Sequence, residues 1–103
     1  IFPRHNVVKV DEETYHIELA LAGYSRSDLS IEVEEGMLVI TGEKDDTETE
    51  YLHKGISTKK FRRTFRLNEN VEIKLAEFVD GLLTIILAHI IPEEKKPRSI
   101  DIK

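Results

Sequence analysis

The chain has 103 residues, a formal net charge of −5, 40% apolar residues, and neither Cys nor Trp. This length predicts one domain, the missing cysteines exclude disulfides and Cys-ligated zinc, and the acidic balance argues against nucleic acid as a partner, because phosphate binding depends on Lys and Arg. No apolar run approaches the roughly 20 residues that span a bilayer, and no signal peptide opens the chain. We therefore expect a cytoplasmic protein without a membrane partner, and a trimmed start because residue 1 is Ile and not Met.

Alternating apolar residues predict short strands along most of the chain, because successive side chains on a strand point to opposite faces. Turn signals separate these segments, and Ser25 is placed to cap a short helix at residues 25–29. The all-β pattern predicts an antiparallel β-sandwich. In chain order, the predicted strands cover residues 6–10, 15–21, 29–34, 37–41, 61–67, 72–78 and 82–87.

A charged stretch of 18 residues, 43–60, interrupts this pattern and contains a small apolar island at Tyr51, Leu52 and His53, with Ile56 just beyond. Connections of this length inside a compact domain are uncommon. One interpretation is a strand that pairs with a neighbouring subunit, which would cover the apolar side chains and an exposed sheet edge together. The other is a mobile loop whose Tyr51 folds back onto its own sheet.

The tail, residues 92–103, contains Pro92 and Pro97 and cannot form a helix. Its Ile100 and Ile102 would project on the same side of an extended chain, roughly 6.6 Å apart. Two apolar side chains on a polar tether suggest a plug for a groove. A last edge strand of the same domain, or a frayed end, is the alternative.

Arg63 falls in phase with Phe61 and Phe65, so it is expected to point where apolar side chains point. A guanidinium in that position needs a partner or access to water, because an unpaired buried charge costs several kcal/mol. A carboxylate across a subunit boundary would satisfy it, since the planar guanidinium suits such pairing. Reaching water at the rim of the domain is the alternative.

Patterns for catalysis and metal binding are missing from the sequence. No Ser lies in a nucleophile elbow, the five glycines form no phosphate-binding loop, and the four histidines are not spaced as metal ligands. We therefore expect no catalytic site, no metal, no cofactor and no small-molecule substrate.

Six segments carry a family resemblance. Residues 76–83 follow the pattern A-x-x-x-n-G-x-L, and residues 100–102 follow the pattern I-x-I. The other four segments are residues 19–24, 28–33, 50–56 and 61–67. In these segments, which cover nearly the whole chain in the family's order, the chain resembles the small heat-shock proteins of the α-crystallin family, and more narrowly the bacterial inclusion-body-binding subfamily.

The resemblance implies an immunoglobulin-like sandwich in residues 1–91 and a C-terminal extension in residues 92–103. It further implies ATP-independent holding of unfolding client proteins by homodimers that assemble into larger oligomers. A sandwich that docks one folded partner, similar to the p23-like co-chaperones, is the competing class.

The same resemblance assigns roles to residues. Exchange of the strand with Tyr51, Leu52 and His53, together with Arg63, would form the dimer interface, and Ile100 and Ile102 would plug a groove on another dimer. The family normally carries a variable apolar arm before this domain, and this chain shows none. The groove would be lined by Leu29, Ile31 and Val33 from one strand and by Ile73 and Leu75 from its neighbour.

Overall fold

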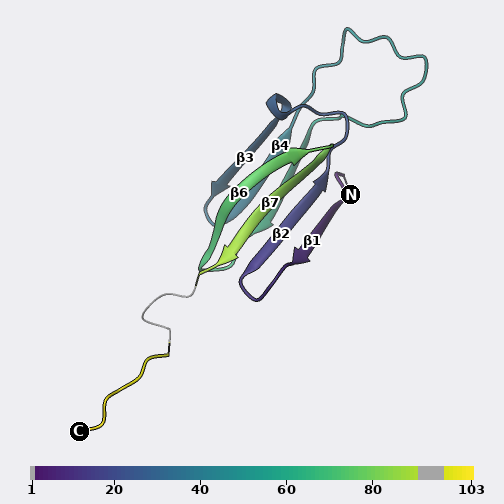
Figure 1. The fold of residues 1–103 in the computed structure, drawn as a ribbon. Coiled ribbons are helices and arrows are strands. Elements are labelled where there is room, and N and C mark those ends of the chain that lie inside the picture. Colours follow the sequence, from purple (N-terminus) through teal and green to yellow (C-terminus); the bar gives the residue numbers. More distant parts are fainter. Residues whose placement is uncertain (1, 91–96) are drawn as a thin grey trace.

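The computed structural model describes residues 2–90 and 97–103, and its strands form two antiparallel sheets packed face to face (Figure 1). The prediction of an all-β sandwich is therefore confirmed. The helix expected after Ser25 is a single 3-10 turn, η1 (Arg26–Asp28), with Ser25 as its N-cap. The strands are β1 (His5–Lys9), β2 (Thr14–Ala20), β3 (Leu29–Glu34), β4 (Met37–Gly42), β5 (Phe61–Arg66), β6 (Val71–Val79) and β7 (Leu82–His89).

The strand order is β1-β2-β7-β6 in the larger sheet and β3-β4-β5 in the smaller one. Each sheet therefore has two edge strands. Contacts between the sheets show which edge strand of one sheet lies next to which edge strand of the other. Strand β1 approaches β5, because the His5 and Phe65 rings lie 5.2 Å apart. Strand β6 approaches β3, because residues of both line one hollow. The sandwich thus has two open sides, each between an edge of one sheet and an edge of the other.

The core fills with the alternate side chains that the sequence pattern predicts. Leu19 of β2, Leu38 and Ile40 of β4, and Ile85 of β7 are all completely buried. These side chains come from strands that lie in the middle of their sheets, where both flanks are covered. Burying a side chain of this size contributes roughly 1.5–3 kcal/mol, so the two sheets hold together mainly through this central layer.

Two tight turns set the register of the sandwich. Glu35 and Gly36 join β3 to β4, and Asp80 and Gly81 join β6 to β7, all four with positive φ. Two positive φ values in a two-residue loop are typical of the type I′ turn, whose twist matches that of the flanking strands. Glycine at the second position adopts this conformation without steric cost.

Strand β6 contains a bulge that breaks its alternation. Ile73 lies opposite Leu87, but Leu75 lies opposite Ile86, so Lys74 is the extra residue. Leu87 points into the core, whereas Ile86 is on the outer face of the sheet. Leu75 therefore faces outward with Ile86, and Ala76 and Phe78 take the inward positions that a regular strand would not give them.

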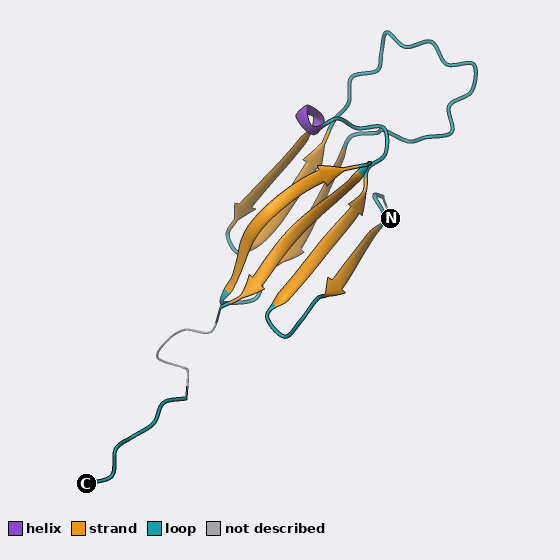
Figure 2. Cartoon of the chain, viewed as in Figure 1, coloured by secondary structure: helices purple, strands orange, loops and turns teal. Residues whose placement is uncertain are grey.

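Two segments leave the sandwich without joining a sheet. Residues 43–60 form the long loop between β4 and β5, as expected, and contain no strand in this single chain (Figure 2). Residues 97–103 are extended and exposed, so the described part of the tail is not an edge strand of its own domain. The expected boundary between residues 91 and 92 lies outside the described residues. No helix in the described part of the chain has the length and apolar character needed to cross a bilayer.

Candidate functional site

The first candidate surface is an apolar groove between β3 and β6, two edge strands of different sheets. Leu29 and Ile31 come from β3, and Ala76 and Phe78 come from β6. Leu83, which is 3% exposed, lies at the floor of the groove. The hollow measures about 260 Å³, enough for one or two aliphatic side chains. Arg26 and Glu77 complete its lining, so the rim is charged and the interior apolar.

Some of the residues predicted for this groove line it in the structure, and others do not. Leu29 and Ile31 line this hollow. Val33 shares their face but lies further along β3, where it is 57% exposed. Ile73 packs against the buried core instead of lining the hollow. The placement of Leu75 in the groove was wrong, because the bulge at Lys74 turns it to the outer face.

Ala76 and Phe78 are the groove residues that the sequence pattern did not identify. They are spaced two apart, which is compatible with one face of a strand, but continuous alternation from Ile73 assigns that face to Leu75. A single inserted residue cannot be read from periodicity alone, since only the pairing with β7 reveals it.

The second candidate surface is the outer edge of β1, on the opposite side of the sandwich. Within the described residues β1 pairs with β2 alone, so one row of its backbone N–H and C=O groups faces solvent. Val7, in the middle of this strand, is 63% exposed. An open edge with apolar side chains is a template for pairing with another strand.

Arg63 finds its partners within its own chain, beside this edge. Its Nη1 donates a 2.7 Å hydrogen bond to the carbonyl oxygen of Pro3, and its Nη2 donates to His5 Nδ1 at 3.1 Å. Its guanidinium carbon lies 5.3 Å from the ring centroid of Phe65. Since the Pro3 side chain is completely buried, Arg63 fastens the segment before β1 to the other sheet. In this single chain a backbone carbonyl and an imidazole therefore take the place of the expected carboxylate.

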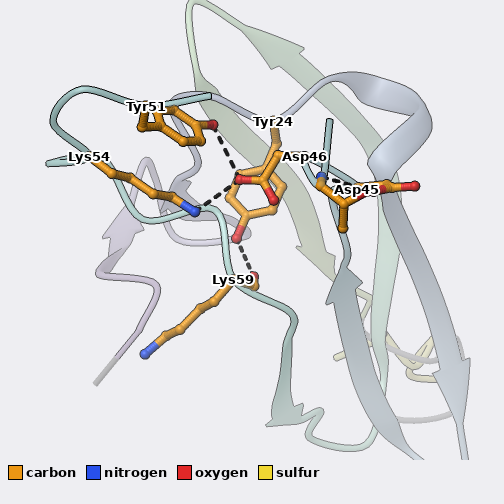
Figure 3. A network of polar contacts seen from close by, with 7 residues as sticks. Tyr24, Asp45, Asp46, Tyr51, Lys54 and Lys59 are labelled. Carbon is orange, nitrogen blue, oxygen red and sulfur yellow. Dashed lines mark hydrogen bonds and ion pairs between the residues drawn. The ribbon is translucent and has the colours of Figure 1, made fainter. Parts of the chain in front are cut away.

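The long loop carries its own polar cluster (Figure 3), which we call the Asp46 cluster, formed by Asp46, Tyr51 and Lys54. Asp46 Oδ2 accepts hydrogen bonds from Lys54 Nζ at 2.9 Å and from the Tyr51 hydroxyl at 3.2 Å. The Lys54 ammonium lies 5.0 Å from the Tyr51 ring centroid. The hydrogen bond from Lys54 lowers the pKa of Asp46, and the same bond raises the pKa of Lys54. Tyr51 is therefore held inside the loop and does not pack on its own sheet.

The end of the loop is anchored by Tyr24, whose hydroxyl donates a hydrogen bond to the carbonyl oxygen of Lys59. The Tyr24 ring packs edge-on against Phe61 with ring centroids 5.6 Å apart. Burial raises the pKa of the Tyr24 hydroxyl, because the charged phenolate is disfavoured away from water. Between this anchor and the Asp46 cluster, Leu52 is fully exposed at 102% and Ile56 is 64% exposed.

In the tail, Ile100 is 79% exposed and Ile102 is 97% exposed. The chain thus presents an apolar groove, an open strand edge, and two segments with uncovered apolar side chains. Such surfaces bind apolar or extended segments of protein and need no reactive group. In the described ranges, no group of three or more His, Asp or Glu side chains is placed to hold a metal ion.

Comparisons with known proteins agree with this arrangement. The Hsp20/alpha crystallin family matches residues 7–103. The small heat shock protein IbpA of Escherichia coli O1:K1 is 44% identical over 103 residues, which cover 98% of this chain and 75% of that protein. Among solved structures, a small heat shock protein from Synechococcus phage S-ShM2 is 38% identical with a TM-score of 0.74, over 99% of this chain and 100% of that one. The small heat shock protein AgsA from Salmonella typhimurium, in a C-terminally truncated form, is 30% identical with a TM-score of 0.75, over 99% and 100% of the two chains.

Proposed function

Since this chain belongs to the Hsp20/alpha crystallin family, we propose that it is a chaperone that holds partly unfolded proteins without ATP and prevents their aggregation. We propose the cytoplasm as its place of action and non-native client chains, together with copies of itself, as its partners.

The observation that carries this proposal is the apolar groove between β3 and β6, open in a chain whose tail exposes Ile100 and Ile102. Unfolding proteins expose apolar side chains and unpaired backbone at the same time. The groove is suited to bind the apolar side chains, and the open edge of β1 is suited to pair with the backbone. Neither interaction requires a particular sequence, so both surfaces suit clients of many sequences.

Self-assembly uses the same surfaces in this proposal. The two isoleucines of the tail dock in the groove of a neighbouring subunit, and clients compete with them for it. Burial of each isoleucine contributes at most roughly 1.5–3 kcal/mol before the cost of ordering the tail. Such a weak plug exchanges readily, so warming shifts the assembly toward smaller species with open grooves.

The dimer forms through the loop in this proposal. The segment at residues 50–56 leaves its own chain and pairs with the open edge of β1 in a second copy. This pairing covers Leu52 and satisfies the unpaired backbone of β1. We propose Tyr51, Leu52, His53 and Arg63 as interface residues, with Arg63 acting through the segment before β1 that it fastens.

The test measures aggregation of a heated malate dehydrogenase by light scattering, with the chain added and no nucleotide present. The parent chain should suppress the scattering at substoichiometric to equimolar subunit ratios. Ile31→Ser, which makes the groove polar, should weaken this suppression, whereas Ser30→Ala, next to it on the exposed face of β3, should not. Unchanged aggregation with the parent chain would show that it does not hold unfolding proteins.

The role of the tail is tested separately by the mass distribution in solution. The double variant Ile100→Ala and Ile102→Ala should form smaller species than the parent, while Ser99→Ala with Lys103→Ala should leave the distribution unchanged. If the isoleucine variant assembles to the same mass as the parent, the tail does not plug the groove between subunits.

A further inference from the structure

The outer face of the smaller sheet, which we call the outer β3–β5 face, separates charges of opposite sign onto different strands. Leu38 and Ile40 of β4 point into the core, so the residues that alternate with them point outward. The acidic side chains of this face are on β3, the uncharged ones of its middle are on β4, and the basic ones are on β5. Its three rows across the strands are Glu34, Met37 and Arg66, then Glu32, Val39 and Thr64, then Ser30, Thr41 and Arg62.

The charges of this face do not neutralise one another within the chain. Strand β4 separates β3 from β5, so side chains on β3 and β5 lie two strand spacings, or roughly 10 Å, apart. Among the described residues, no ion pair joins Glu32 or Glu34 to an arginine. The side chains that β3 and β5 contribute to the face are all exposed.

The separation of charge is sharpest at the end of the face where Glu34 and Arg66 lie. The hollow that borders Arg66 on the other side of β5 has no carboxylate in its described lining. Glu34 is followed in the chain by a second carboxylate, that of Glu35. At the opposite end the two signs are mixed, because one hollow there is lined by Arg62, Lys60, Asp28 and Glu43.

The middle of the face is apolar. Val39 is only 7% exposed although it points away from the core and lies outside the buried core cluster. Side chains of the neighbouring strands therefore cover it, since long polar side chains can lay their aliphatic stems on an apolar surface and keep their charged ends in water. Met37 is half-buried on the same strand. An apolar middle thus lies between a negative flank and a positive flank.

We propose that the outer β3–β5 face is an interface between two copies of the chain, packed face to face about a twofold axis that runs parallel to β4. This rotation places β4 over β4 and, at both flanks, β3 of one copy over β5 of the other. Glu34 of each copy then faces Arg66 of the other. A twofold axis across the strands would instead place β3 over β3 and bring like charges together, so the charge pattern selects the first axis.

The contact is small and uses neither the groove nor the β1 edge. Three strands of six residues cover roughly 300 Å² per copy, whereas stable interfaces bury roughly 800 Å² per partner. The face therefore adds a lateral contact between copies, which is strongest at high protein concentration and weakens with added salt. Leu29 and Ile31 point to the other side of β3, so the groove stays accessible when the face is covered.

Cross-linking of cysteine variants tests this interface, and the chain has no native cysteine to interfere. Met37→Cys and Thr41→Cys lie at opposite ends of β4, and a short bismaleimide should link each to the same position of a second copy, because an axis along β4 keeps every row over itself. A mixture of the two variants, one lengthened by a tag, should give no linked heterodimer, since the two positions are roughly 13 Å apart along the strand. Thr84→Cys, on the outer face of the larger sheet, is the control and should not link.

Charge reversal in the Thr41→Cys chain tests why the copies associate. Arg62→Glu with Arg66→Glu makes both flanks of the face acidic, and Glu32→Arg with Glu34→Arg makes both flanks basic. Each double variant alone should lower the yield of linked dimer about fivefold, because like charges then oppose each other. An equimolar mixture of the two double variants should restore the yield, because every flank again meets the opposite sign.

A control separates this pairing from an effect of net charge. Glu12→Arg with Glu13→Arg, in the connection between β1 and β2, changes the net charge as much as the basic double variant does. Mixing this control with the acidic double variant should not restore the yield.

The remaining outcomes would contradict the proposal in different ways. Heterodimers linked between Met37→Cys and Thr41→Cys would retain the face but overturn the axis. Links to heated malate dehydrogenase in place of a second copy would assign the face to clients. No link from either cysteine, or a yield that charge reversal leaves unchanged, would overturn the interface, whereas the aggregation and tail experiments above would keep their own results.

Discussion

At the scale of single residues, two polar side chains connect irregular segments to the sandwich. Tyr24 fastens the end of the long loop through the carbonyl of Lys59, and Arg63 fastens the segment before β1 through the carbonyl of Pro3. Each donates a hydrogen bond to the carbonyl oxygen of a residue that lies outside the strands. Removing such a donor leaves a partly buried carbonyl oxygen without a hydrogen-bond partner. This lowers the free energy of unfolding by more than the net contribution of the hydrogen bond itself.

Tyr24→Phe should lower the free energy of unfolding by about 1–2 kcal/mol at neutral pH, through loss of this hydrogen bond. Burial raises the pKa of the Tyr24 hydroxyl above its ordinary value of 10.0. Its contribution is therefore complete below pH 10 and is lost as the pH rises through the raised pKa. Urea unfolding at pH 8 and at pH 10.5 should show less alkaline loss of stability for Tyr24→Phe than for the parent. Tyr51→Phe, in the exposed loop, should behave like the parent at both pH values.

Arg63→Met should destabilise the fold by about 1–3 kcal/mol, because the Pro3 carbonyl loses its charged donor. Trypsin should also cleave after Arg4 faster, since the segment before β1 is released from β5. Arg62→Met, whose side chain lies on the opposite, exposed face of β5, is the matched control and should change neither measurement. Equal cleavage rates for both variants would show that Arg63 does not hold this segment.

At the scale of elements, the long loop is the part whose conformation must change most for the assembly that we propose. In the single chain its polar groups satisfy one another around Asp46, and its apolar side chains face water. These contacts are exposed and weak, so the balance between the closed loop and a paired strand is set by small differences. A loop of this kind can act as a reversible connection between subunits.

Asp46→Asn should favour the dimer, because it removes the charge that holds Lys54 in the closed loop. We expect the dissociation constant measured by analytical ultracentrifugation to fall about two- to fivefold. Asp45→Asn is the control, because Asp45 accepts its hydrogen bonds from Thr47 within the same turn and not from Lys54. A dimer weakened by Asp46→Asn would mean that the Asp46 cluster belongs to the assembled state.

At the scale of the whole molecule, the sandwich has a buried core between its central strands, and both of its sides are open. The loop and the tail leave it from opposite ends, so one chain can contact different neighbours through each (Figures 1 and 2). The buried strands β2, β4 and β7 do not depend on a second copy, whereas the groove and the edge of β1 are open in the single chain and would be covered by the partner that we propose. Folding of the core and covering of the edges are therefore separate contributions to stability.

The melting temperature should rise with protein concentration, because assembly stabilises the folded chain by mass action. Leu19→Ala should lower the free energy of unfolding by about 2–5 kcal/mol at every concentration, as expected for a core cavity. Ile100→Ala with Ile102→Ala should instead reduce the dependence on concentration and leave the dilute chain unchanged. Differential scanning calorimetry over a hundredfold range of concentration distinguishes the two. A melting temperature independent of concentration for the parent would contradict assembly through these surfaces.

Local patterns in the sequence were sufficient to predict the strands, the turns, the loop at residues 43–60 and the inward set in β2, β4 and β7, because alternation and turn chemistry act between residues close in the chain. Alternation also placed Leu29 and Ile31 on one face of β3, and both line the hollow between β3 and β6. Leu75 was placed on the wrong face, and Ala76 and Phe78 were missed, because the extra residue at Lys74 is defined only by its pairing with β7. The partners of Arg63 were equally out of reach, since Pro3 and His5 are separated from it by about sixty residues and meet it only across the two sheets. The sequence by itself thus determined which residues form strands and which face of β2, β4 and β7 is buried. Only the tertiary structure decided which face β6 buries beyond its bulge, which edges meet and what lies between them, because these depend on how strands and sheets pair and not on neighbours along the chain.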